Sequence, residues 1–342
     1  MNKKYSELAE LFRSEKTDEE ILDFLLNYHK NDIADMMAGM TEEERKRLYH
    51  LLGAQKVAEI FKYIEEPRKY IRELSVESAA RVISEMDSDD AVDLLEDLDP
   101  EEKEQIVRML DEDAKKDVKM LLSYDEEEIG SCMTTNYICI PEDLTIKQAM
   151  SELVKQAGEN DNIMTIYVVD EKGVFAGAID LKDLIRAREN THLKDLVLKS
   201  YPYVTDHEKI DDCMDRILDY AEDSIPVLSE DKRILGVITS EDLIEMVDNE
   251  MGEDYAKLAG LTAEEDLKEP IVQSMKKRLP WLIILLFLGM GVSSVVGLFE
   301  NVVAVLPIVI CFQSLVLDMA GNVGTQSLAV TIRVLMDENL TG

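Results

Sequence analysis

The chain has 342 residues, of which 72 are acidic and 37 basic, giving a formal net charge of −35 and an isoelectric point near 4.4. This charge argues against a nucleic-acid-binding protein, because neutralising phosphates requires clustered lysine and arginine. A hydrophobic content of 46% is too high for a disordered acidic chain, so we expect a folded, strongly acidic protein of about two or three domains.

The charge is concentrated in the first 278 residues, which hold all but one of the basic and all but four of the acidic residues. A polyanionic part followed by an almost uncharged tail is typical of a membrane protein. The four cysteines form no CxxC pair and have no metal-ligand spacing with histidine, so we expect free cytosolic thiols. The first 20 residues have no apolar stretch of the kind found in a secretory signal.

Residues 1–125 are predicted to form short helices joined by polar turns, because apolar residues recur three and four positions apart. A weak internal repeat relates residues 34–40 to residues 80–86. Acidic clusters at the breaks suit helix N-termini, where carboxylates cap free N–H groups and complement the helix dipole. We therefore predict an acidic, all-α helical-repeat superhelix.

Two copies of a strand–turn–strand–helix unit follow, each preceded by an amphipathic helix. Residues from Ile166 align with those from Ile225 at a constant offset of 59, and Gly177 matches Gly236. This α/β pattern resembles a tandem pair of cystathionine-β-synthase-type (CBS) regulatory modules. The two modules are expected at 129–190 and 191–248.

A charged connecting helix is predicted over 249–278, leading to the 20 uncharged residues 280–299. As a helix, that stretch reaches about 30 Å, the thickness of the bilayer hydrocarbon. Lys276, Lys277 and Arg278 precede it and Trp281 lies at its edge, so residues before it are expected to be cytoplasmic.

A second apolar stretch over 302–332 contains the sequence LDMAGNVGTQS, beginning at Leu317. Residues 279–342 are therefore expected to form transmembrane α-helices of a multi-pass protein of the plasma membrane.

The order of these parts and the LDMAGNVGTQS motif resemble the MgtE family of magnesium channels and transporters. Met319 and Ala320 depart from the motif, because many relatives carry Thr and Gly there. The resemblance implies a homodimer in the bilayer that imports Mg²⁺, with five transmembrane helices per subunit. This chain holds two of them, so a fragment or a truncated gene product is expected, with an incomplete pore.

Carboxylates are the candidate metal ligands, because Mg²⁺ favours one or two carboxylates and retained water. Asp89 and Asp93 are four residues apart and share one helix face. Composition alone describes such residues as solvated helix faces, whereas the resemblance implies cation-sensing sites between the helical domain, the CBS pair and the connecting helix. Cys213 stands where some relatives carry Glu, which implies a lost ligand. The candidate ligands are Asp89, Asp93, Asp211, Asp223, Asp242, Glu245, Glu250, Glu253 and Asp254.

We expect high cytosolic Mg²⁺ to bridge these domains and hold the connecting helices against the pore. Like charges 4 Å apart repel by about 4 kcal/mol at an effective dielectric constant of 20, so loss of Mg²⁺ separates the domains. The alternative is a membrane-anchored adenine-nucleotide or Mg²⁺ sensor that regulates a partner without transport. An enzyme is not expected, because the sequence contains no nucleophile–base pair, P-loop or metal-hydrolase motif.

Thr239 and Asp242 have the Thr-x-x-Asp form that adenosine-binding CBS modules use for phosphate and ribose, so ATP is a candidate ligand. The first module carries Asp180 in place of that threonine, which disfavours phosphate. The alternative is two capped helices without a ligand.

In the second apolar stretch, Asp318 and Asn322 are candidate pore-lining residues. A carboxylate is costly in lipid and by default faces a cavity or a polar partner, and a carboxamide can bind a hydrated cation. The alternative is a packing seam of small residues at Gly321 and Gly324.

Overall fold

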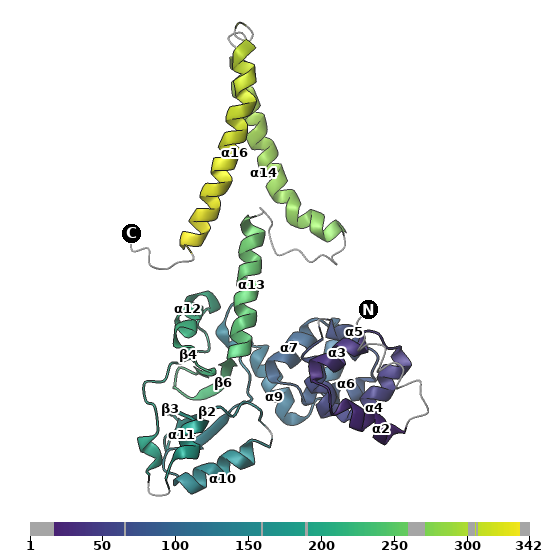
Figure 1. The fold of residues 1–342 in the computed structure, drawn as a ribbon, viewed down its shortest axis with the longest axis vertical. Coiled ribbons are helices and arrows are strands. Elements are labelled where there is room, and N and C mark those ends of the chain that lie inside the picture. Colours follow the sequence, from purple (N-terminus) through teal and green to yellow (C-terminus); the bar gives the residue numbers. More distant parts are fainter. Residues whose placement is uncertain are drawn as a thin grey trace. The chain divides into compact units, whose positions relative to one another are not determined.

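The computed structural model describes residues 17–64, 66–158, 160–188, 191–258, 271–299, 305 and 307–335. The chain divides into two compact units, Met1–Leu243 and Ile244–Gly342, and each is described by itself. Figure 1 shows the helical domain and the two α/β modules of the first unit, and the long helices of the second.

The described part of the first 125 residues consists of helices joined by short turns, as predicted. Helix α6 packs against α4 and α8, and α7 packs against α9. The small residues Ala79 and Ala80 of α6 and the side chains of Leu94 and Leu95 of α7 are buried in the domain core. The helices are α2 (Asp18–Leu25), α3 (Lys30–Met37), α4 (Glu42–Phe61), α5 (Pro67–Ile71), α6 (Val76–Ser84), α7 (Ser88–Glu96), α8 (Pro100–Met109) and α9 (Glu112–Leu121).

Several of these helices begin at the polar clusters seen in the sequence. Thr17 and Thr41 each form a capping box, accepting a hydrogen bond from the backbone N–H three residues on, at Glu20 and Glu44. The glutamate side chain in turn accepts from the threonine N–H, so two otherwise unpaired donors are satisfied at each start.

The two α/β modules repeat one topology. In each, a first strand runs parallel to a second, which pairs antiparallel with a third. Ile166 pairs with Ile179 and Ile225 with Ile238, so the sequence offset of 59 is also the offset in register. The elements of the first module are η1 (Ile129–Cys132), β1 (Ile138–Pro141), α10 (Ile146–Gln156), β2 (Thr165–Val169), β3 (Phe175–Asp180), α11 (Leu181–Arg186) and η2 (Leu193–Asp195). Those of the second are β4 (Val204–Thr205), α12 (Ile210–Tyr220), β5 (Ser224–Leu228), β6 (Ile234–Thr239) and α13 (Ser240–Leu258).

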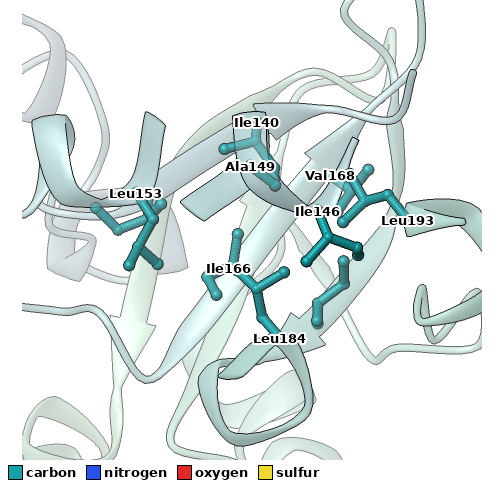
Figure 2. Packing of buried hydrophobic residues seen from close by; sticks show 10 residues of the cluster. Ile140, Ile146, Ala149, Leu153, Ile166, Val168, Leu184 and Leu193 are labelled. Atoms are coloured by element: carbon teal, nitrogen blue, oxygen red, sulfur yellow. The ribbon is translucent and has the colours of Figure 1, made fainter. Parts of the chain in front are cut away.

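The core of the first module lies between its sheet and its helices. Figure 2 shows Ile166 and Val168 of β2 against Ile146 and Ala149 of α10, with Leu184 of α11 completing the cluster. The opposite face of this sheet packs on the second module. There the fully buried Tyr167 shares a 2.6 Å hydrogen bond with the Ser224 hydroxyl. The modules are therefore joined by a continuous buried interface.

Each module also receives a backbone segment that belongs to the start of the other. Thr134, which lies before β1, pairs antiparallel with Val237 of β6, and Leu198, which lies before β4, pairs with Ala178 of β3. Gly177 neighbours Ala178 with φ +144°, and a Cβ there would collide with the Leu198 carbonyl. Glycine is required where a backbone approaches this closely.

We predict that Gly177→Ala lowers the free energy of unfolding by about 2 kcal/mol or more, because both the close approach and the positive φ oppose a side chain. For a domain of this size that corresponds to a fall of about 4–8 °C in the thermal unfolding midpoint. Gly158→Ala is the matched control, because its new Cβ would meet only the Lys155 carbonyl oxygen, at 3.5 Å. Equal midpoints for the two variants would contradict the prediction.

The second unit contains the long helices α14 (Ile271–Leu298) and α16 (Pro307–Leu335), together with most of α13. Within the described residues, one helical segment, Ser274–Leu298, is long enough and apolar enough to span a membrane. Its large apolar side chains are exposed, Leu286 by 62% and Phe287 by 63%. A helix that is apolar on all sides and unburied is suited to lipid. The predicted connecting helix corresponds to the end of α13 and the start of α14, and residues 259–270 lie outside the described part.

Candidate functional site

An acidic cluster lies where the helical domain meets the second CBS module. Asp87 is the N-cap of α7, Asp89 and Asp90 are in its first turn, and Asp242 is in the first turn of α13. Asp89 is half-buried, and its Oδ1 atom is buried without a hydrogen-bond partner. Burial raises the pKa of Asp89 well above its ordinary value, and the nearby charge of Asp242 raises it further. An unpartnered carboxylate oxygen at this depth is suited to a cation.

Asp90 was not among the predicted ligands but belongs to the same cluster. Burial raises the pKa of Asp90 to about 7, against the opposing effect of the Lys62 ammonium group. Its charge therefore changes near neutral pH. No local pattern distinguishes Asp90 from its acidic neighbours, because its surroundings include residues distant along the chain, such as Lys62, Asp161 and Glu241.

Asp242 is held by the start of its own helix. The Thr239 backbone N–H donates to Asp242 Oδ2 at 2.7 Å, and the Asp242 N–H donates to the Thr239 hydroxyl at 3.3 Å. Burial raises the pKa of Asp242, while hydrogen bonds to its carboxylate from the backbone and side chain of Thr239 oppose the rise. The predicted nucleotide pair Thr239 and Asp242 thus forms a helix cap in this structure. In the first module, Asp180 makes no such side-chain cap at α11.

Lys62, at the C-terminal end of α4, brings a positive charge to this cluster. Its Nζ atom lies 3.1 Å from Glu241 Oε2 and 3.8 Å from Asp87 Oδ2. Although burial alone would lower the pKa of Lys62, the carboxylates of Asp90, Glu241 and Asp87 raise it overall. Sequence reasoning missed this lysine, because its partners are far away along the chain.

Hydrogen bonds join the helical domain to the segment before β1. The Thr135 N–H donates to the Ser88 hydroxyl at 2.9 Å, and the Thr135 hydroxyl donates to Asp117 at 2.8 Å. The Asn136 carboxamide donates to Asp87 Oδ1 at 2.8 Å and accepts from the Asp161 N–H at 3.0 Å. We call the contacts of Ser88, Asp87 and Asp117 with residues 135–136 the docking seam. The seam places the acidic start of α7 against the CBS pair.

The other predicted ligands are not gathered at this point. Asp93 is exposed one turn after Asp89, and Asp211, Asp223 and Glu245 are also exposed. In the part of the chain that is described, no group of three or more His, Cys, Asp and Glu side chains is arranged to hold a metal ion. The side chains of three further candidates lie outside the described residues: Glu250, Glu253 and Asp254.

Three remaining residues of interest occupy distinct environments. Cys213 is completely buried in the second module, so this position does not offer a side chain to the acidic surface. Asp318 and Asn322 are exposed and lie four residues apart on α16, which puts them on one face of that helix.

Comparisons with known proteins agree with this architecture. Residues 28–127 match the MgtE intracellular N domain family, and residues 127–190 and 193–249 match the CBS domain family. The magnesium transporter MgtE of Enterococcus faecalis is 38% identical over 339 residues, which cover 98% of this chain and 74% of that protein. The magnesium transporter MgtE of Thermus thermophilus is 32% identical over 222 residues, which cover 64% of this chain and about half (49%) of that protein.

Solved structures give the same result for the first unit. The soluble part of a magnesium transporter is 29% identical and has a TM-score of 0.69, covering 72% of this chain and 98% of that one. The cytosolic domain of the Mg²⁺ channel MgtE in complex with ATP is 27% identical with a TM-score of 0.63, covering 70% of this chain and 99% of that one. The helical domain, the tandem CBS modules and the extent of the Enterococcus match together establish that this chain belongs to the MgtE family of magnesium transporters.

Proposed function

We propose that this chain acts in the import of Mg²⁺ across the plasma membrane as part of a homodimeric transporter, and that cytosolic Mg²⁺ closes the transporter. Membership of a magnesium transporter family supports Mg²⁺ as the cargo. The observation that carries the sensing role is the half-buried Asp89 carboxylate, whose unpartnered oxygen lies within the electrostatic reach of Asp242.

The proposed mechanism is a shift between docked and separated arrangements of the helical domain and the CBS pair. Without a cation, the carboxylates of Asp89, Asp90 and Asp242 repel one another across the contact and favour separation. A hydrated Mg²⁺ ion held by one or two of these carboxylates removes the repulsion and favours docking. Since Mg²⁺ binds the docked arrangement better, its concentration sets the population of each. The connecting helix, with candidate ligands Glu250, Glu253 and Asp254, would pass this change to the membrane.

The membrane part of the proposal is supported by the exposed apolar side chains of α14. Lys276, Lys277 and Arg278 stand at the start of its uncharged stretch, which favours a cytoplasmic location for the sensor. Asp318 and Asn322 on α16 are the proposed pore-lining residues, because a carboxylate within a membrane helix requires a polar partner or a hydrated cation.

The proposal predicts that Mg²⁺ slows hydrogen exchange at the docking seam. With the chain in lipid nanodiscs, we expect millimolar Mg²⁺ to slow the exchange of peptides covering 86–90 and 133–137 by about tenfold, a typical size for coupling between ligand and conformation. Ca²⁺ and ATP serve as comparators, and Mg²⁺ uptake into liposomes tests transport directly. Exchange at the seam that is indifferent to Mg²⁺ would contradict the sensing role.

A second candidate function is adenine-nucleotide sensing by a membrane-anchored protein without transport. Its support is the ATP complex of the similar cytosolic domain and the Thr-x-x-Asp pair of Thr239 and Asp242 in the second module. In the same experiment, protection of β6 and the start of α13 by ATP, with no effect of Mg²⁺ at the seam and no Mg²⁺ uptake, would favour this second function.

A further inference from the structure

Lys62 of the helical domain forms an ion pair with Glu241 of the second CBS module. It ends α4, and its side chain is only 29% exposed. The ammonium group contacts Glu241, which belongs to the first turn of α13, and Asp87, which caps α7. One partner thus lies in each of the two domains that the docking seam joins.

The surroundings of Lys62 form an acidic cavity of about 190 Å³ between these domains. Asp87 and Asp90 line it from the helical domain, and Asp161 and Glu241 line it from the CBS pair. The other lysine of the cavity, Lys30, forms a 2.9 Å ion pair with Glu59 of its own domain. Of the two lysines, Lys62 is therefore the one that contributes positive charge across the contact.

An ammonium group differs from a divalent cation in what it can hold. It is a single point charge with three donors on a flexible stem, so it can bridge two carboxylates but cannot gather a full shell of oxygen ligands. It is also covalently part of the chain, so its charge is available at any Mg²⁺ concentration. Lys62 can thus cancel part of the repulsion between the domains before any ion binds.

We propose that Lys62 is a tethered cation that offsets part of the repulsion between the helical domain and the CBS pair while no divalent cation is bound. This inference deepens the proposed function and rests on it in one respect, namely that docking is the closed state of the sensor. Lys62 then sets how much Mg²⁺ is needed to complete docking, because the ions supply only the positive charge that the lysine does not.

The test compares hydrogen exchange at the docking seam in Lys62→Met and in the parent chain, in nanodiscs and in EDTA. We expect the peptide covering 133–137 to exchange about fivefold faster in the variant, the effect of losing one partly buried ion pair. Lys62→Arg, which keeps the charge, should exchange within about twofold of the parent. The matched control is Lys46→Met, which removes an exposed lysine that pairs with Glu42 on its own helix.

A second variant, on the CBS side of the ion pair, keeps the test valid if Lys62→Met misfolds the helical domain. Glu241→Gln removes the partner on the CBS side, where the side chain is 64% exposed, and should speed seam exchange by a similar factor. The double variant Lys62→Met with Glu241→Gln should then exchange no more than about twofold faster than Lys62→Met alone, because the two residues act as a pair. Equal exchange of Lys62→Met, Glu241→Gln and the parent in EDTA would overturn the proposal.

Measuring exchange with added Mg²⁺ distinguishes a failure of this proposal from a failure of the proposed function. At saturating Mg²⁺, Lys62→Met should regain the protection of the parent, because the ions supply the missing charge. If Mg²⁺ protects neither protein while Lys62→Met still exchanges faster in EDTA, the sensing role fails and the tethered cation stands. If Mg²⁺ protects both equally and the EDTA rates match, the sensing role stands and the tethered cation fails.

Discussion

Replacing Asp89 and Asp242 together by asparagine should abolish the dependence of docking on Mg²⁺. In EDTA, we expect the docking seam of this variant to exchange at least as slowly as that of the parent chain, because two half-buried carboxylates no longer repel each other. Added Mg²⁺ should then slow exchange by less than about twofold, against about tenfold in the parent, because the ion has lost its charged ligands.

The matched control for this double variant removes the same charge elsewhere. Asp35→Asn with Glu96→Gln neutralises two exposed carboxylates of the helical domain. It should leave both the exchange rate in EDTA and the Mg²⁺ midpoint unchanged, since exposed charges are screened by solvent and salt. A normal Mg²⁺ response in the variant with asparagine at 89 and 242 would show that the cation binds elsewhere.

The second large effect concerns pH. Mg²⁺ affinity should fall about tenfold between about pH 8 and about pH 6, because a proton on Asp90 competes with the ion when the pKa of that carboxyl is about 7. Isothermal titration calorimetry of the chain at both pH values measures the change directly. Asp90→Asn should remove most of the pH dependence.

Docking in the absence of Mg²⁺ should depend on pH in the opposite direction to Mg²⁺ affinity, and should weaken as the pH rises. The pKa of Asp90 in the docked arrangement lies above its ordinary value of 3.8, so the docked state binds more protons than the separated one between those values. Docking should therefore be strongest below about pH 4 and weaken as the pH rises through about 7. His207 has a raised pKa because it bonds to Glu128, so His207→Gln is the control. A pH dependence that disappears in His207→Gln and persists in Asp90→Asn would contradict the assignment to Asp90.

The CBS pair was the part of the fold most easily predicted from the sequence, because the same apolar pattern occurs in two copies. The offset of 59 between Ile166 and Ile225 is visible in the apolar pattern of the sequence. The strand pairs of the two sheets show the same offset. Asp89 and Asp242 were both candidate ligands because of the family resemblance, but their proximity was not predicted. No periodicity links two residues that are so far apart and lie in different domains.

The remaining site residues could not have been predicted from local pattern. Lys62 follows a helix like many exposed lysines, and only the fold brings it to Glu241. Asn136 lies in an irregular segment, and its role comes from simultaneous contacts with Asp87 and the Asp161 backbone. Such contacts depend on how two folded domains pack against each other. Neither hydrophobic periodicity nor helix capping predicts that packing.

The backbone pairing of Thr134 with Val237 gives the docking contact a mechanical consequence. Thr134 is directly followed by the seam residue Thr135, and Val237 lies three residues before α13 begins at Ser240. Two backbone hydrogen bonds of 2.9 Å clamp these segments together. These two hydrogen bonds link the docking seam directly to β6, so we expect a displacement of the helical domain to reach the start of α13 by a short path.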